Sequence, residues 1–380
     1  MRNNKIIWLC LLAGLILSSC RDRYEPDIDA AVTSYLVAEG ILNTNGPTTI
    51  RLSRSTQLDT FLLRPETSAS LVVEGRDNSA RPLLNMGDGR FYSPDLNLSM
   101  GEEYRVKISS QGYDYVSEYV QAVVTPEVDS ISWKLEDEGL RIYANTHDPS
   151  GNTRYYRWEY EETWEVRAYY YASYIYLPDG TVRERIMPAE EVYQGWKYNN
   201  STSILTATSA KLQTDIISEA PLTFIPPRDE KLAVRYSILV RQYALDKKGY
   251  AFYQMMKRNT ESLGTVFDPQ PTDIRGNITC VTDPSIPVIG YIGANSITEK
   301  RIFINRSQLP AWGFRQTCQD YEVMNHPDSI NLAFGGGGLE PYDAVFSEFN
   351  PDIIVKYKAS GPICVDVRRR GASLTRPVYW

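Results

Sequence analysis

The stretch YYRWEYEETW, residues 155–164, decides how the second half of the chain folds. Its aromatic residues Tyr156, Trp158 and Tyr160 alternate with charged residues. Successive side chains of a β-strand point to opposite faces, so the pattern predicts a strand with one aromatic face and one charged face. We expect the aromatic face to lie in the core of a large sandwich, because strands are enriched in aromatic residues. The alternative is a stacking platform for sugars or a surface for a partner.

A second group of tyrosines follows this strand, at Tyr169, Tyr170, Tyr171 and Tyr174. Three consecutive rings cannot all face the interior from one strand, so at least one of the first three should be exposed. We therefore take these four tyrosines as a candidate aromatic binding surface.

Residues 32–125 carry the pattern of an immunoglobulin-like β-sandwich. Residues 104–108 alternate between apolar and charged side chains, as in a half-buried strand. About seven such short segments recur at a spacing of roughly 8–12 residues, with turn residues between them. The Cys…Trp…Cys pattern of true immunoglobulin domains is absent, so only the architecture is predicted. Pro126 cannot continue a central strand and marks the predicted boundary to a larger β-rich domain over residues 126–380.

One helix is predicted in this larger domain. Asp246 can cap its first turn, and Tyr250, Tyr253 and Met256 recur at three-residue spacing before a terminal Gly264. Its apolar face is expected to pack on the sheet. The predicted fold class is therefore mainly β, with an N-terminal immunoglobulin-like sandwich followed by a larger β-rich domain with one helix.

The rest of the larger domain is predicted to contain short strands and loops. Strands are expected at residues 277–282, 288–293 and 301–305, and residues 312–380 are expected to be irregular.

The first 31 residues indicate export and anchoring. The apolar run over residues 6–17 follows two basic residues and has 12 residues, whereas a membrane span needs about 20. Small residues lie directly before Cys20, as in a bacterial lipobox; the alternative is an ordinary signal peptide with an incidental thiol. We predict a signal peptide over residues 1–19, lipidation of Cys20, and a tether over residues 20–31. The acyl chains would then attach the protein to a membrane.

The composition favours strands and turns and argues against a nucleic-acid partner. The chain contains 27 tyrosines, 7 tryptophans, 24 glycines and 22 prolines. With 47 acidic and 40 basic residues it has a formal net charge of −7, which repels nucleic acid. The basic run at residues 368–370 is too short to override this charge.

Motifs for catalysis or metal binding are missing from the sequence. It contains no Cys-x-x-Cys, H-E-x-x-H, Walker A, EF-hand or G-x-S-x-G pattern. The two histidines, His147 and His326, are expected to be solvated loop residues. The carboxylates between Glu159 and Glu165 could form a glycosidase pair, but any chain with 47 acids offers such pairs. We therefore expect a non-catalytic protein without a cofactor or metal.

Three cysteines follow Cys20 in the sequence, at Cys280, Cys318 and Cys364. An exported protein can form a disulfide, and three pairings are open.

Several motifs, spread over nearly the whole mature chain, are similar to those of a known family. They are YYRWEYEETW at 155–164, RYSILVRQY at 235–243, the helix at 253–264, GNI at 276–278, PVIGY at 287–291, and the ending CVDVR…PVYW at 364–380. The ending is similar to a C-x-D-C-R…K-P-D-F-W tail. On these residues the chain resembles the Bacteroidota outer-membrane lipoproteins labelled domain of unknown function 4249.

The resemblance also bears on the cysteines. The family often has a second cysteine where this chain has Val367, which leaves Cys364 as the only thiol of the tail. The resemblance thus implies that an upstream cysteine forms a disulfide with Cys364 and so links the tail to the body. Cys318 is the candidate.

The family resemblance implies an outer-membrane lipoprotein, often encoded near a TonB-dependent receptor, and no known activity. We expect a lipid-anchored protein that captures substrate for, or gates, a TonB-dependent β-barrel transporter. A weakly acidic stretch at residues 21–25 favours the cell surface over the periplasmic face. A surface adhesin or envelope structural module is the second hypothesis, and a glycan or peptide hydrolase the third.

Overall fold

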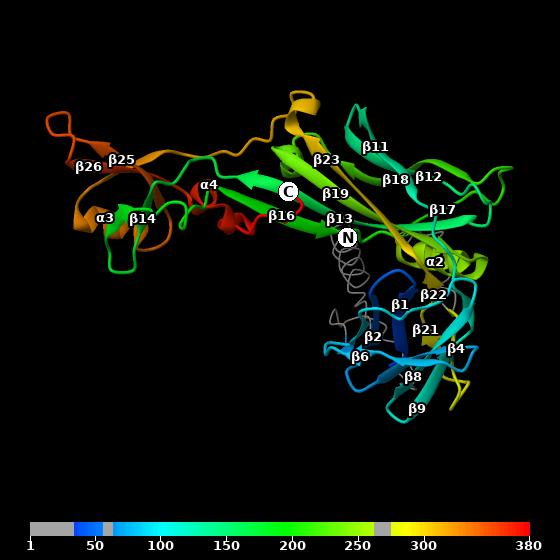
Figure 1. The fold of residues 1–380 in the computed structure, drawn as a ribbon. Helices are drawn as coiled ribbons and strands as arrows, with labels where there is room; N and C mark the ends of the chain where they lie inside the picture. The colour runs from blue at the N-terminus through cyan, green and yellow to red at the C-terminus, as the bar shows by residue number, and fades with distance from the viewer. Residues whose placement is uncertain (1–33, 56–63, 262–274) are drawn as a thin grey trace, which may run out of the picture.

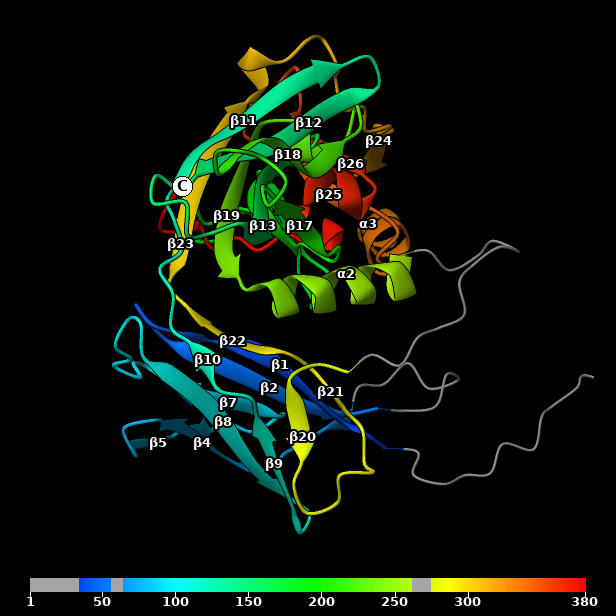
Figure 2. The same ribbon diagram turned by 90° about the vertical axis from the view of Figure 1, so that its right-hand side faces the viewer.

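The computed structural model describes residues 34–55, 64–261 and 275–380. The predicted signal peptide, the lipidation site Cys20 and the tether lie outside these residues. The described chain forms a β-sandwich, a larger two-sheet body that we call the platform, and a distal lobe (Figures 1 and 2). The prediction of a mainly β protein is confirmed.

Two sheets face each other in the sandwich. The first contains β1 (Leu36–Asn43), β2 (Thr48–Arg54), β3 (Arg64–Pro65), β6 (Leu84–Asn85), β7 (Arg90–Ser93), β21 (Val288–Ile289) and β22 (Ile292–Asn295). The second contains β4 (Ser70–Gly75), β5 (Ala80–Pro82), β8 (Glu103–Ser110), β9 (Tyr113–Ser117), β10 (Val120–Gln121) and β20 (Ile278–Cys280). The predicted alternation of residues 104–108 is confirmed, because Tyr104, Val106 and Ile108 are buried in the common core.

The predicted domain division needs a correction, because the sandwich is discontinuous in sequence. Strands β20, β21 and β22 lie far beyond Pro126, yet they belong to the two sandwich sheets. β1 pairs in parallel with β21 and β22, and Gly40 lies opposite Ile292. Cys280 and Ile292 are fully buried in the sandwich core. Local patterns predict that a segment is a strand, but they do not show which sheet it joins, since pairing partners are distant in sequence.

The platform consists of two sheets packed face to face. One contains β11 (Val128–Glu136), β12 (Gly139–His147) and β18 (Ile216–Ile225). The other contains β13 (Tyr155–Arg167), β16 (Gln194–Asn200), β17 (Leu205–Thr208), β19 (Arg235–Leu245) and β23 (Ile297–Asn305). Short 3₁₀ helices, η1 (Glu230–Leu232) and η2 (Arg306–Gln308), flank these strands.

The aromatic face of β13 lies inside the platform, as predicted. Tyr156 is fully buried and Trp158 is 2% exposed, in one core with Ile142 and Ile238 from both sheets. The indole nitrogen of Trp158 donates a 2.8 Å hydrogen bond to Gln242 Oε1. Because these rings are buried and internally bonded, they cannot serve as a stacking platform for sugars.

Helix α2 (Lys247–Glu261) packs on the platform beside the sandwich (Figure 2). The predicted cap is confirmed, because Asp246 Oδ1 accepts a 2.6 Å hydrogen bond from the Gly249 amide. The Tyr250 ring lies 5.0 Å from the Tyr155 ring of β13. The predicted terminus at Gly264 lies outside the described residues.

The distal lobe comprises residues 170–192 and 318–365, which contain two small cores of their own. It contains β14 (Tyr174–Tyr176), β15 (Val182–Glu184), β24 (Tyr321–Met324), β25 (Glu340–Phe346), β26 (Ile354–Ser360), α3 (Pro327–Phe334) and α4 (Pro362–Val365), and η3 (Val367–Arg370) follows it. Figure 1 shows it projecting from the platform away from the sandwich.

The prediction of one helix and an irregular tail is therefore wrong. The described chain contains α3 and α4 besides α2, and the lobe has a three-stranded sheet in the order β24-β26-β25. Helices of 8 and 4 residues are too short to show a reliable 3.6-residue period. Within the described ranges, no helix combines the length and apolar character needed to span a membrane.

The discontinuous sandwich can be tested at Ile292. Replacing this fully buried side chain by alanine should lower the free energy of unfolding by about 2–5 kcal/mol, because a cavity opens in the sandwich core. Val281→Ala is the control, because Val281 is 52% exposed in the same segment. Urea unfolding of both variants checks this, and equal losses would contradict the assignment of β22 to the sandwich core.

Candidate functional site

The four tyrosines of the predicted aromatic surface do not share one surface. Tyr169 is 56% and Tyr171 49% exposed. Tyr170 stacks on Tyr342 with 4.1 Å between ring centroids, and Tyr174 is only 5% exposed in the lobe core. The prediction is thus corrected to two exposed rings. The segment between β13 and β14 is not a strand, so its side chains do not alternate in a regular way.

This tyrosine segment, which leads from β13 into the lobe, is bound to helix α4. The amides of Tyr169 and Tyr170 both donate to the carbonyl of Cys364, at 2.9 and 3.0 Å. Tyr174 donates a 3.1 Å hydrogen bond to Glu184 of β15. Burial, helped by the Glu184 carboxylate, raises the pKa of Tyr174 to about 12. These contacts give Tyr170 and Tyr174 a structural role.

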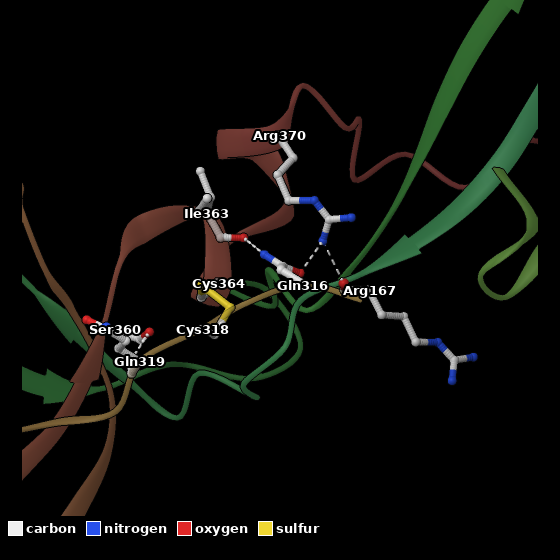
Figure 3. Close-up of a disulfide and its surroundings, with 8 residues drawn as sticks. All are labelled: Arg167, Gln316, Cys318, Gln319, Ser360, Ile363, Cys364 and Arg370. Carbon is white, nitrogen blue, oxygen red and sulfur yellow. Dashed lines mark hydrogen bonds between the residues drawn. A yellow bond between two sulfur atoms is a disulfide. The ribbon is translucent and has the colours of Figure 1, made fainter. Parts of the chain in front are cut away.

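Cys318 and Cys364 form a disulfide, the pairing that the family resemblance implies (Figure 3). Their Cα atoms are 5.9 Å apart, within the range that a disulfide requires. Cys280 is a free thiol buried in the sandwich core. The bridge joins the segment that leaves the platform to α4.

Hydrogen bonds flank the bridge on both sides (Figure 3). Gln316 Nε2 donates to the carbonyl of Ile363 at 2.8 Å, and Ser360 Oγ donates to the carbonyl of Gln319 at 2.6 Å. Arg370 donates to Gln316 Oε1 at 3.1 Å. The connection between platform and lobe is therefore held at several points.

The C-terminal residues cover part of the outer face of the platform. Tyr379 and Thr163 share a 2.7 Å hydrogen bond, and the Arg301 guanidinium lies 3.6 Å from the centroid of the Tyr379 ring. Trp380 packs edge-on against Trp196 and Phe303. The PVYW ending of the sequence therefore has a structural role, because it packs on the platform.

Two of the carboxylates considered for a glycosidase pair, Glu162 and Glu165, are buried in the platform and engaged by neighbouring side chains. Glu162, 1% exposed, accepts hydrogen bonds from Lys231, Tyr236 and Asn199, at 2.7, 2.8 and 2.9 Å. Glu165 pairs with Arg167 at 2.8 Å. A carboxylate whose oxygens are bound in this way is poorly placed to exchange protons with a substrate.

The two histidines lie at the surface, as predicted, but His147 is the last residue of β12 and not a loop residue. His147 is about half exposed and its Nδ1 lies 2.8 Å from Asp129. His326 precedes α3 and lies 3.6 Å from Asp328. In the part of the chain that the structure describes, no three His, Cys, Asp or Glu side chains form a metal-binding group.

The junction between sandwich and platform is a buried hydrogen-bond network. Thr125 Oγ1 donates to the carbonyl of Ser296 and accepts from the Ala244 amide at 3.0 Å. Ser296 Oγ accepts from the Thr125 amide at 2.8 Å, and Asn295 Nδ2 donates to the Ala244 carbonyl at 2.8 Å. All four residues are at most 5% exposed. The network joins the chain entering the platform to the strand leaving the sandwich.

The linker is fixed at the next residue as well. The carbonyl of Pro126 accepts hydrogen bonds from Gln242 Nε2 at 2.8 Å and from Thr298 Oγ1 at 2.9 Å. Because Gln242 also bonds Trp158, the junction is continuous with the platform core. The orientation of the sandwich on the platform is therefore set by buried polar contacts.

An open cleft of about 1170 Å³ lies beside this junction. It is lined by residues of β1, by α2, and by the charged outer face of β13, β19 and β23. Its principal side chains are Glu39, Glu127, Arg157, Glu159, Arg241, Tyr243, Phe252, Tyr253, Met256 and Glu299. A cleft of this size, with aromatic and polar walls, can hold a ligand of several sugar or amino-acid units.

The arginines of the cleft are held by aromatic rings and carboxylates. Arg157 lies 4.5 and 4.7 Å from the ring centroids of Tyr243 and Tyr253, and pairs with Glu159 at 2.6 Å. Arg241 pairs with Glu161 at 2.6 Å and with Glu299. Burial, and then the Glu159 carboxylate, raises the pKa of Tyr243.

The charge of the cleft limits what it can bind. Four glutamates and two arginines line it, and Glu39 and Glu127 are exposed. The excess of carboxylates disfavours an anionic ligand, whereas the aromatic rings and paired charges suit an uncharged polar ligand.

Sequence patterns predicted two of the elements that line this cleft, the strand over residues 155–164 and the helix with Tyr253 and Met256, but not the cleft itself. The charged face of residues 155–164 was predicted and is confirmed, because Arg157 and Glu159 both line the cleft. The opposite wall comes from β1, more than one hundred residues away, and no local pattern brings the two together.

The junction network can be tested at Thr125. Thr125→Val keeps the shape of the side chain but leaves the Ala244 amide and the Ser296 carbonyl without their partner. We expect a loss of about 2 kcal/mol or more in the free energy of unfolding. Thr279→Val, at an exposed position of β20, is the matched control and should change stability little. Similar values for both in urea unfolding would contradict the importance of the network.

The disulfide can be tested with the double variant Cys318→Ser, Cys364→Ser. A bridge between residues 46 apart should contribute up to about 4 kcal/mol by restricting the unfolded chain. Reductant should therefore lower the unfolding midpoint of the wild type and leave the double variant unchanged. An equal response of both proteins to reductant would contradict a structural bridge.

Comparisons with known proteins support the family and little beyond it. The chain is similar over part of its length to a segment of two fibronectin type III domains from chicken tenascin, at 12% sequence identity. This match covers 56% of this chain and 92% of that one, with a TM-score of 0.16. No curated protein matches the chain. The family model described as "Domain of unknown function (DUF4249)" matches residues 21–301, which is more than half of the chain, and the protein therefore belongs to this family.

Proposed function

We propose that this protein is a non-catalytic, lipid-anchored accessory protein of a TonB-dependent transporter in the outer membrane. It captures substrate for the transporter or gates its entry. The observation that carries the proposal is the open cleft of about 1170 Å³ beside a fixed junction. Aromatic rings and paired charges line this cleft, which is the chemistry of a capture site.

The lipobox at Cys20 supports the location. Lipidation there would place the sandwich next to the membrane through the tether, since β1 begins at Leu36. Display on the cell surface would put the cleft in contact with external substrates. The engaged carboxylates of the platform favour capture over hydrolysis.

A surface adhesin is the second candidate function. It is favoured by the large apolar side chains that the distal lobe exposes, such as Leu332 at 88%. An adhesin would bind host or cell-surface polymers without a barrel partner, so the two functions predict different partners.

Affinity purification of the C-terminally tagged, lipidated protein from outer membranes in mild detergent separates them. We expect a TonB-dependent β-barrel to co-purify in a stoichiometric amount, identified by mass spectrometry. The Cys20→Ala variant is the control, because loss of the lipid should remove the protein from the membrane fraction and reduce recovery of the barrel. A folded wild type that brings no barrel would contradict the transport function and favour the adhesin.

A further inference from the structure

The distal lobe concentrates the exposed apolar side chains of the chain. Its 71 residues carry 10 of the 25 large hydrophobic side chains that are exposed in the described chain. Within the lobe the strongest exposure is at the turn between β25 and β26, where Phe349 is 97% exposed beside Phe346 at 45% and Ile353 at 52%. Figure 1 shows these strands at the end of the lobe farthest from the sandwich. Exposed apolar groups gathered at one place indicate an interaction site.

The turn that carries Phe349 is ordered by its own hydrogen bonds. The Ser347 amide donates to the Ile353 carbonyl at 2.8 Å, and the Ile353 amide donates to the Asn350 carbonyl at 3.1 Å. The Phe349 amide donates to Ser347 Oγ at 3.2 Å, and the Asp352 amide to Asn350 Oδ1 at 3.0 Å. Phe349 is thus presented on a preformed turn, which reduces the entropy that binding would cost.

The negative charge of the lobe favours a partner with a basic surface. The lobe contains 11 acidic and 4 basic residues, a formal charge of −7, which equals the net charge of the entire sequence. Glu348 and Asp352 flank Phe349; both are exposed, and neither has an ion-pair partner among the described residues. Such a surface is repelled by anionic lipid and nucleic acid and attracted to a basic protein surface.

We infer that the β25–β26 turn docks onto a protein partner, with Phe349 in an apolar pocket and Glu348 and Asp352 against a basic rim. Phe349 would act as the anchor of the interface, and the acidic lobe would steer the approach. The inference rests on the proposed function, since it names the surface through which the protein engages its barrel. No residue of the lobe, which lies wholly within the described ranges, lines the cleft, so docking through the lobe leaves the cleft open to substrate.

The test compares lipidated full-length variants bound to the barrel that co-purifies with the wild type. Phe349→Ala should weaken binding to the purified, immobilised barrel roughly 30-fold or more, as for an interface anchor. Glu348→Lys with Asp352→Lys should also weaken binding and reduce its dependence on salt. Leu135→Ala, at the exposed end of β11, and Asp137→Lys, in the turn that follows, are the matched controls and should bind as the wild type does.

The outcomes separate this inference from the proposed function. If the wild type brings no barrel, the proposed function fails and the inference fails with it. If the barrel binds the Phe349 and charge variants as tightly as the wild type, the inference is overturned while the proposed function stands. Flotation with purified lipid vesicles, zwitterionic or anionic, covers the remaining outcome for the Cys20→Ala protein. Binding to vesicles that is lost in Phe349→Ala would overturn the protein partner in favour of a membrane.

Discussion

The arrangement of the whole molecule depends on the buried hydrogen bonds around Thr125. The chain passes between sandwich and platform at this residue and again at Ser296. Hydrogen bonds between Thr125 and Ser296 join these two crossing points. Backbone polar groups buried at such a crossing must find partners, and here side-chain hydroxyls supply them. The Pro126 carbonyl also accepts a hydrogen bond from Gln242 in the platform core. A rotation of the sandwich relative to the platform would therefore break these hydrogen bonds and leave buried polar groups without partners. The cleft beside the junction keeps its shape for the same reason.

The distal lobe is also held in place by specific contacts, which come from the C-terminal part of the chain. The disulfide between Cys318 and Cys364 and the bonds of Arg370 hold the lobe at its base. The final residues Tyr379 and Trp380 close over the platform and leave the lobe free to project. Covalent and aromatic contacts are thus placed at the base of the lobe, while Phe346, Phe349 and Ile353 are exposed at its far turn.

Local sequence patterns predicted the features that depend on neighbouring residues, namely strand alternation and the start of a helix. The alternation at residues 104–108 and 155–164 gave correct strands, and Asp246 gave the start of α2. The sheet membership of β20–β22 could not be predicted, because strand pairing is decided by partners far away in sequence. The burial of Tyr174 was missed for the same reason, since its neighbours come from β25 and β26. The cleft was missed because its walls come from different units.

The discontinuous sandwich has a consequence for how the protein is made. Strands β20–β22 are synthesised after nearly the whole platform, so the sandwich is completed only after most platform strands have been made, although β1–β10 precede them. Until then the early strands of the sandwich have part of their edges and core uncovered, a condition that favours aggregation and the need for chaperones. Because the platform sequence interrupts the sandwich sequence, the sandwich cannot be transferred between genes as one continuous segment. Any rearrangement that moves it must carry the platform along, so the two units are expected to have diversified together.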